Sequence, residues 1–240
     1  MNSSDFRQRA REALKGNWLM AIVAGLIASF LGATINSSSG VSFDFEVDNY
    51  TDADMEAAFS ALGITEEMIA GFLAVVGVLA VIGLFYSVLM FVVGSPVAVG
   101  YAQFNLDLID GQGATIGTMF SRFGQMKEAI ISRFFRGLFV ALWSLLFVIP
   151  GIIAAYSYAM TDYILAENPD MTAREAIAES KRLMKGNKWR LFCLELSFIG
   201  WALLSILTLG IGSLWLVPYT QAAYAAFYRD IKQEAYFIVE

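Results

Sequence analysis

The chain has 240 residues, of which 58% are hydrophobic and 16% are charged, and its formal net charge is -6. A soluble domain usually carries about 25% charged residues, so this composition predicts a membrane protein. Histidine is absent and Cys193 is the only cysteine, which excludes an internal disulfide and a multi-cysteine metal site and removes the commonest general base. We therefore expect no enzyme activity, no metal and no cofactor.

Basic residues are confined to four short clusters, at 7–15, 122–136, 174–190 and the pair Arg229 and Lys232. Lysine and arginine are retained on the cytoplasmic side of a membrane while apolar runs cross it. This segregation predicts a multi-pass protein of the inner membrane with both termini in the cytoplasm. The negative net charge is local, since eight of the 22 acidic residues lie between residues 44 and 67.

The first part of the chain predicts an amphipathic helix over residues 3–15 and then a crossing over 19–35. A basic segment before an apolar run is also typical of a secretory signal, but no small-residue cleavage site closes this one. Residues 36–67 are polar and acidic, and we expect an extracytoplasmic loop between the first two crossings. The alternation at 41–48 is typical of a strand. The second crossing is predicted over 68–106.

The central and last apolar stretches are both expected to turn back on themselves. Residues 137–161 carry no charge although basic clusters flank them, and residues 191–228 carry only Glu195. Between them, Thr172 with Glu175 forms a capping-box pattern that predicts a cytoplasmic amphipathic helix within 168–190. Helix breaks are expected at Pro96, Pro150, Gly151, Gly210, Gly212 and Pro218.

Together these elements predict an all-α polytopic membrane protein: a single membrane domain over 1–240, with about six transmembrane helices in three hairpins and interfacial amphipathic helices. The dipeptides at 15–16, 136–137 and 185–186 each pair a basic residue with glycine, just before an apolar run. One hypothesis is therefore three copies of one hairpin unit. The alternative is that membrane sequences reuse few residue types.

Two acidic residues in apolar surroundings, Glu195 and Asp162, are candidates for a polar site inside the membrane, because acids there are costly and often functional. Glu195 lies about a turn and a half from Arg190, so structural pairing with Arg190, Lys188 or a basic residue of another helix is expected, and a proton or substrate role is the alternative. Basic residues of the cytoplasmic clusters either bind anionic lipid headgroups or only set the orientation. The candidate lipid contacts are Arg7, Arg11, Lys15, Lys181, Arg182, Lys185, Lys188 and Arg190.

Several short segments carry a resemblance to a known family. They are ALKGNW at 13–18, IPGIIA at 149–154, LMKGNK at 183–188, LTLGIG at 207–212 and LWLVPY at 214–219. With these segments the chain resembles the bacterial integral-membrane family labelled domain of unknown function 975, most densely over 149–228. The resemblance implies a polytopic protein of the bacterial cell membrane, found mainly in Gram-positive bacteria, and carries over no catalytic residues. The acidic loop has no counterpart in it.

The favoured function is therefore a non-enzymatic membrane component that associates with lipids, supports the envelope or docks a partner. The alternative is a small transporter or accessory permease subunit, in which Glu195 and Asp162 face a central cavity. We expect membrane lipids, and other membrane proteins, as partners. Nucleic acid is disfavoured because Glu175 and Glu179 interleave with the basic residues around them. Oligomeric state is not predicted by any pattern in the chain.

Overall fold

The computed structural model describes residues 2–33 and 65–237, and every regular element within these ranges is a helix. The all-α class is therefore confirmed for that part of the chain. The strand pattern at 41–48 and nearly all of the acidic loop lie outside it. The chain divides into two compact units, one of Met1–Thr34 with Phe91–Glu240 and one of Ile35–Met90.

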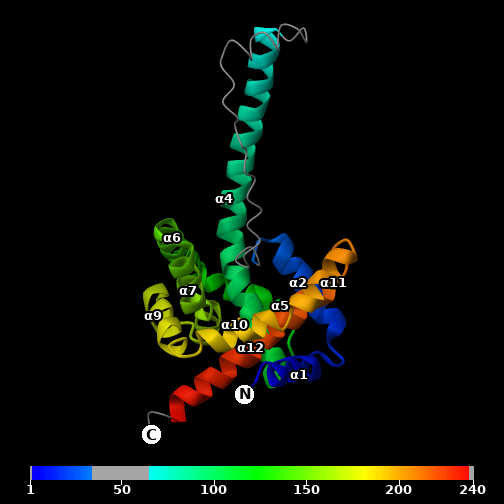
Figure 1. Cartoon of the computed structure of the whole chain (residues 1–240), viewed down its shortest axis with the longest axis vertical. Helices are drawn as coiled ribbons and strands as arrows, with labels where there is room; N and C mark the ends of the chain where they lie inside the picture. The colour runs from blue at the N-terminus through cyan, green and yellow to red at the C-terminus, as the bar shows by residue number, and fades with distance from the viewer. Residues whose placement is uncertain (1, 34–64, 238–240) are drawn as a thin grey trace. The chain divides into compact units, whose positions relative to one another are not determined.

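Most helices belong to the first unit, and α4 continues from the second unit into it (Figure 1). In chain order the helices are α1 (Ser3–Leu14), α2 (Trp18–Phe30), α4 (Glu66–Asp110), α5 (Ile116–Phe120), the 3-10 helix η1 (Ser121–Gln125), α6 (Met126–Leu146), α7 (Val148–Tyr158), α8 (Thr161–Glu167), α9 (Ala173–Leu183), α10 (Lys188–Leu196), α11 (Ile199–Leu207) and α12 (Ser213–Phe237).

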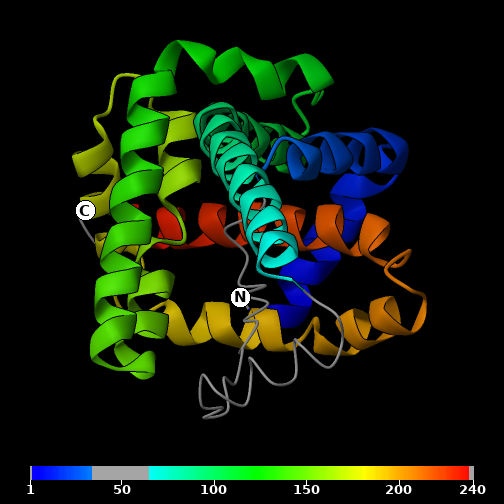
Figure 2. The ribbon, with the colours of Figure 1, turned by 90° about the horizontal axis from the view of Figure 1, so that it is seen from above.

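The core of the first unit gathers around α12, which runs between α2 on one side and α10 with α11 on the other (Figure 2). Helix α1 packs along α12, and the rings of Phe6 and Phe227 meet edge to face at 5.3 Å. Small side chains allow helices to approach closely in membrane proteins. Four alanines of α12 are completely buried: Ala222, Ala223, Ala225 and Ala226.

Amphipathic helices were predicted before the first apolar run and after residue 168, and both are present. Phe6, Ala10 and Leu14 are the buried residues of α1. In α9 the Thr172 hydroxyl accepts from the Glu175 amide and the Glu175 carboxylate accepts from the Thr172 amide. The predicted capping box is therefore confirmed. Whether α9 faces the cytoplasm remains a prediction.

The prolines do not break helices where the sequence predicted breaks. Pro96 lies inside α4 and Pro218 inside α12, and both helices continue through them. Each proline lacks the amide that would donate to the carbonyl four residues earlier, at Val92 and Leu214, and both helices continue without that hydrogen bond.

The break between α6 and α7 falls at the extended residue Phe147, and not at Pro150 and Gly151. Pro150 is the third residue of α7, where an amide has no partner inside the helix and proline is tolerated. Gly151 also lies within α7. The break predicted at Gly210 and Gly212 is confirmed, since both lie between α11 and α12.

Among the described residues, four helical stretches are long and apolar enough to cross a membrane: Ala70–Asp110, Ile116–Leu146, Val148–Glu167 and Lys188–Leu207. Helices α1 and α2 would add a fifth if they formed one span, but they are bent by 104°. The described part of the chain therefore has four helices capable of spanning a membrane, or five with the bent pair, against the six crossings predicted. Helix α6 runs through Arg136 and Gly137, whereas Gly16 and Gly186 lie in turns, so the three dipeptides do not share one local structure.

Candidate functional site

Asp162 forms an ion pair that joins α6 to α8. Both Arg136 terminal nitrogens donate to its carboxylate, at 3.0 Å to Oδ2 and 2.6 Å to Oδ1. Such fork-shaped pairing is strong and directional. The side chains of Arg136 and Asp162 are 11% and 20% exposed, so the pair is largely shielded. Asp162 therefore holds two helices together at the base of the α6–α7 hairpin.

Pairing of Glu195 with Arg190 was one expectation from the sequence, and the structure shows other partners for Glu195. Its carboxylate accepts hydrogen bonds from the hydroxyls of Tyr156 in α7 and Tyr224 in α12, the second at 3.0 Å. Five residues along an α-helix turn the side chain through about 140°, so Arg190 and Glu195 point in different directions. Arg190 instead binds Asp230 at 2.5 Å and Glu234 at 2.6 Å.

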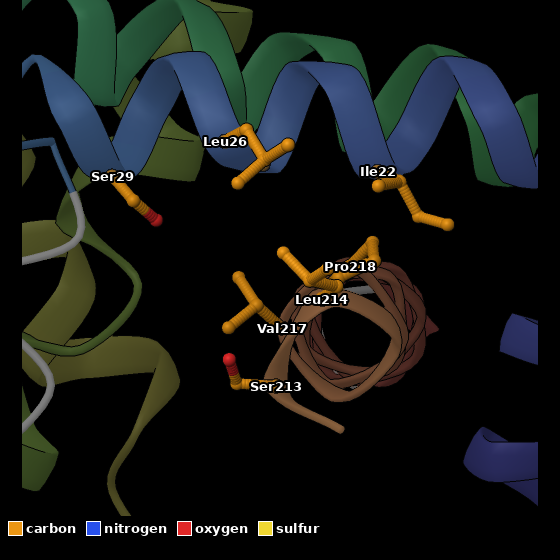
Figure 3. A pocket seen from close by; sticks show the side chains of 8 residues that line it. Ile22, Leu26, Ser29, Ser213, Leu214, Val217 and Pro218 are labelled. Atoms are coloured by element: carbon orange, nitrogen blue, oxygen red, sulfur yellow. The ribbon is translucent and has the colours of Figure 1, made fainter. Parts of the chain in front are cut away.

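The structure does not bring the two candidate acids together. No hydrogen bond or ion pair between described residues joins Glu195 to Asp162, and each has its own partners. Two small hollows of the first unit are lined by other side chains. One, of about 140 Å³, lies between α2 and α12, where Ile22 and Leu26 face Leu214 and Val217 (Figure 3). The other, of about 90 Å³, lies beside α8, α9 and α12.

Sequence reasoning assigned no role to Arg133, which is only 6% exposed. Its Nη2 donates to the Gly32 carbonyl at 2.5 Å, and its guanidinium lies over the Phe91 ring at 5.4 Å from the centroid. Gly32 lies in the turn just after α2, so Arg133 anchors the segment that follows this helix. The cluster at 122–136 therefore supplies buried structural cations as well as surface charge.

Four of the eight candidate lipid contacts are engaged inside the protein. Arg190 is paired as described above, and Arg182 forms an ion pair with Glu179 at 2.6 Å. Arg7 Nη1 donates to the Ser197 carbonyl at 3.3 Å, and Arg11 Nε donates to the Arg7 carbonyl at 3.4 Å. The other four have no ion pair with described residues. These are Lys15, Lys181 and Lys185, which are exposed, and Lys188, which is partly buried.

Two of these lysines occupy matching turns. The turn at 14–17 joins α1 to α2, and the turn at 184–187 joins α9 to α10. The glycines Gly16 and Gly186 have φ angles of +90° and +88°, a conformation that favours glycine. The amide of the following asparagine donates to the carbonyl three residues earlier, at 2.9 Å and 3.2 Å respectively. Each turn therefore presents its lysine outward from the same backbone shape.

Each turn is followed by a tryptophan, but the two tryptophans have different surroundings. Trp18 is partly buried and lies 6.5 Å from the Tyr219 ring, while Trp189 is 70% exposed and stacks on Phe192 at 5.1 Å. Tryptophan is enriched at the level of lipid headgroups. Lysine and tryptophan therefore occur together at both junctions between a polar helix and an apolar one.

A second pair of matching features was missed by sequence reasoning. A Cβ atom on Gly151 would lie 2.0 Å from Ser144 Oγ, and one on Gly212 would lie 2.7 Å from Ser205 Oγ. In both hairpins a serine of the first arm thus packs against a glycine seven residues later. The signal was present in the sequence, because ALWSLLFVIPG at 141–151 and ALLSILTLGIG at 202–212 share five identical positions.

The sequence matches one protein family over most of its length. No match is found among curated proteins or among solved structures. The family described as protein of unknown function (DUF975) matches residues 75–235, well over half of the chain, including both hairpins and the second of the matching turns. The chain therefore belongs to this family.

Proposed function

We propose that this chain is a non-catalytic protein of the bacterial inner membrane that binds anionic headgroups of the cytoplasmic leaflet through its exposed lysines. The observation that carries the proposal is the pair of matching turns, which place Lys15 and Lys185 outward beside a tryptophan. Both termini would then lie on the cytoplasmic side, in keeping with the segregated cations.

The helices that precede the turns support the same function. Helices α1 and α9 bury one face and leave charged residues on the other. Lys181 is exposed on α9 and has no ion pair with described residues, whereas its neighbour Arg182 is paired with Glu179. The Arg182 guanidinium holds the pKa of Glu179 below its usual range. Lys181 is therefore better placed than Arg182 to meet a lipid phosphate.

The proposal is tested by the stability of the purified full chain in neutral detergent, with phosphatidylglycerol or phosphatidylcholine added. Each basic residue near an anionic surface contributes about 1 kcal/mol. Replacing Lys15, Lys181 and Lys185 with glutamine should therefore remove about 3 kcal/mol of the extra stabilisation by phosphatidylglycerol. Arg182→Gln is the matched control and should remove much less. Equal stabilisation of the triple variant and the unchanged protein would contradict the proposal.

A small transporter or accessory permease subunit is the second candidate, and Glu195 is the residue that favours it. This acid lies partly buried between Tyr156 and Tyr224, near the middle of an apolar segment. Glu195→Gln removes the charge and keeps one of the two oxygens that accept from the tyrosines. If the chain carries protons with a substrate, this variant should lose proton-coupled uptake into vesicles. Unchanged uptake would argue against the transporter.

A further inference from the structure

The tips of the α6–α7 and α11–α12 hairpins are apolar and exposed on all sides. We define the hairpin tips as residues 141–149 and 206–211. Every residue of both segments is exposed, and Leu145 and Leu209 reach 86% and 95%. Their only polar side chains are Ser144 and Thr208. A helix end that packs against protein hides at least one face, so these tips are suited to an apolar solvent on every side.

The backbone of the second tip meets the requirement that hydrocarbon imposes. In lipid each backbone amide must find a partner within the protein. Every amide from 208 to 216 donates a hydrogen bond, and the Gly212 amide does so to the Thr208 hydroxyl. Thr208 Oγ1 in turn donates to the Ser205 carbonyl at 3.0 Å. A loop in water would not need this complete internal pairing.

The first tip is paired less completely, because the Val148 and Ile149 amides donate to no described residue. The Phe147 amide donates to the Trp143 carbonyl, and the Gly151 amide donates to the Phe147 carbonyl. The first turn of a helix leaves amides without partners. Pro150 stands in that first turn and has no amide to satisfy. Placing proline three residues after the break therefore reduces the polar surface left at the tip.

The depth of the second hairpin is limited by α1. The Tyr219 hydroxyl donates to the Arg7 carbonyl at 3.3 Å, and the Arg7 guanidinium donates to the Ser197 carbonyl. Helix α1 carries the exposed charged residues Asp5, Arg11 and Glu12, so hydrocarbon cannot surround it. Tyr219 is six residues from Ser213, where α12 begins after the turn, or about 9 Å along the helix. With the turn itself, this hairpin extends about 10 Å beyond a polar helix.

The depth of the first hairpin is limited by α9 in the same way. Ile177 of α9 packs with Ala154 and Tyr158 of α7, and Val140 of α6 packs against this cluster. Val140 lies seven residues before Phe147, or about 10 Å along the helix. The Arg136–Asp162 pair lies about 16 Å below the tip on the same scale. The hydrocarbon core of a bilayer is about 30 Å thick, so neither hairpin reaches across it.

We propose that the two hairpins are re-entrant wedges that enter only the leaflet beside α1 and α9 and end among its acyl chains. The partner of both tips is then the hydrocarbon of one leaflet. Volume added to one leaflet and not to the other expands that leaflet, so the chain favours membranes that are convex on the side of α1 and α9. This inference concerns the acyl chains and stands independently of the proposed headgroup contacts.

Labelling of single cysteines in the full chain tests where the tips end. Cys193→Ala removes the natural cysteine, and Phe147→Cys, Leu209→Cys or Lys181→Cys is then added. The proteins are reconstituted into vesicles of phosphatidylglycerol and phosphatidylethanolamine. We expect a membrane-impermeant maleimide to label Lys181→Cys from one side only. It should label neither tip from either side until detergent is added.

Tip labelling from the side opposite Lys181→Cys would show that the hairpins cross, and labelling from the same side would show that the tips lie in water. Either result overturns the proposal. Spin labels at the tips should be relaxed by oxygen and not by a water-soluble nickel complex. Strong spin–spin coupling between tips of different molecules would mean that a second copy covers them, which also overturns it.

Vesicle size tests the wedge itself. The mean vesicle diameter should fall as the ratio of protein to lipid rises, and an unchanged diameter would overturn the wedge. The variant with Lys15, Lys181 and Lys185 replaced by glutamine should keep its tips protected from label. Failure of the headgroup proposal can thus be told apart from failure of this one.

Discussion

Replacing Gly151 with alanine should force the two arms of the α6–α7 hairpin apart. A Cβ atom at this position would lie 2.0 Å from Ser144 Oγ and 2.9 Å from Ser144 Cα. The hydroxyl can rotate away, but Cα belongs to the backbone of α6, so a helix must shift. Overpacking of this kind costs about 1–3 kcal/mol. We expect Gly151→Ala to lower the free energy of unfolding by about 2 kcal/mol.

Gly137 provides the matched control, since a Cβ atom there would have no neighbour within 4 Å. Gly137→Ala lies inside α6 and should stabilise the chain by about 0.5–1 kcal/mol. Adding Ser144→Gly to Gly151→Ala removes the closest contact and should recover part of the loss. Denaturant unfolding in mixed micelles measures all three variants. If Gly151→Ala is as stable as Gly137→Ala, the close helix contact is not present and the reasoning is refuted.

Three further predictions use the same unfolding measurement. Asp162→Asn leaves the Arg136 guanidinium without its charge partner and should cost about 3 kcal/mol, and a cost near zero would contradict the shielded pair. Gly186→Ala places a side chain at φ +88° and should cost about 1–2 kcal/mol, whereas Gly137→Ala should not destabilise. Hydrogen bonds from the Thr172 amide and hydroxyl lower the pKa of Glu175 below 4.5. The stability that they add is complete above pH 4.5 and is lost as the pH falls through the lower folded pKa. Glu175→Gln should remove this part of the pH dependence.

Local features of the helices could be predicted from the sequence because they depend on residues close together in the chain. The capping box of α9 needs only Thr172 and Glu175, three residues apart, and the turn at Gly186 needs only its own backbone conformation. The apolar face of α1 follows from the spacing of Phe6, Ala10 and Leu14. These contacts lie within one or two helical turns, so tertiary packing leaves them unchanged.

Predictions that depended on partners in other helices were less successful. Arg190 was assigned to Glu195 because the two are close in sequence, but α12 supplies Asp230 and Glu234 to the arginine. Tyr156 and Tyr224 reach Glu195 from helices that the sequence does not place beside it. Proline positions were misjudged for a related reason. Pro150 is tolerated because it stands in the first turn of α7, and the sequence alone does not show where that helix begins.

The number of membrane crossings is the feature that the length of an apolar run predicts least directly. The length of the run gives the distance that a helix can cover, but not the level at which it starts. In this chain the starting level depends on contacts far apart in the sequence. Tyr219 meets Arg7 of polar α1, and Ile177 of polar α9 meets the α6–α7 hairpin. In the proposed arrangement, part of each apolar stretch lies level with a polar helix, and only about 10 Å of it remains to enter lipid. A segment long enough to cross can thus end halfway, in one leaflet.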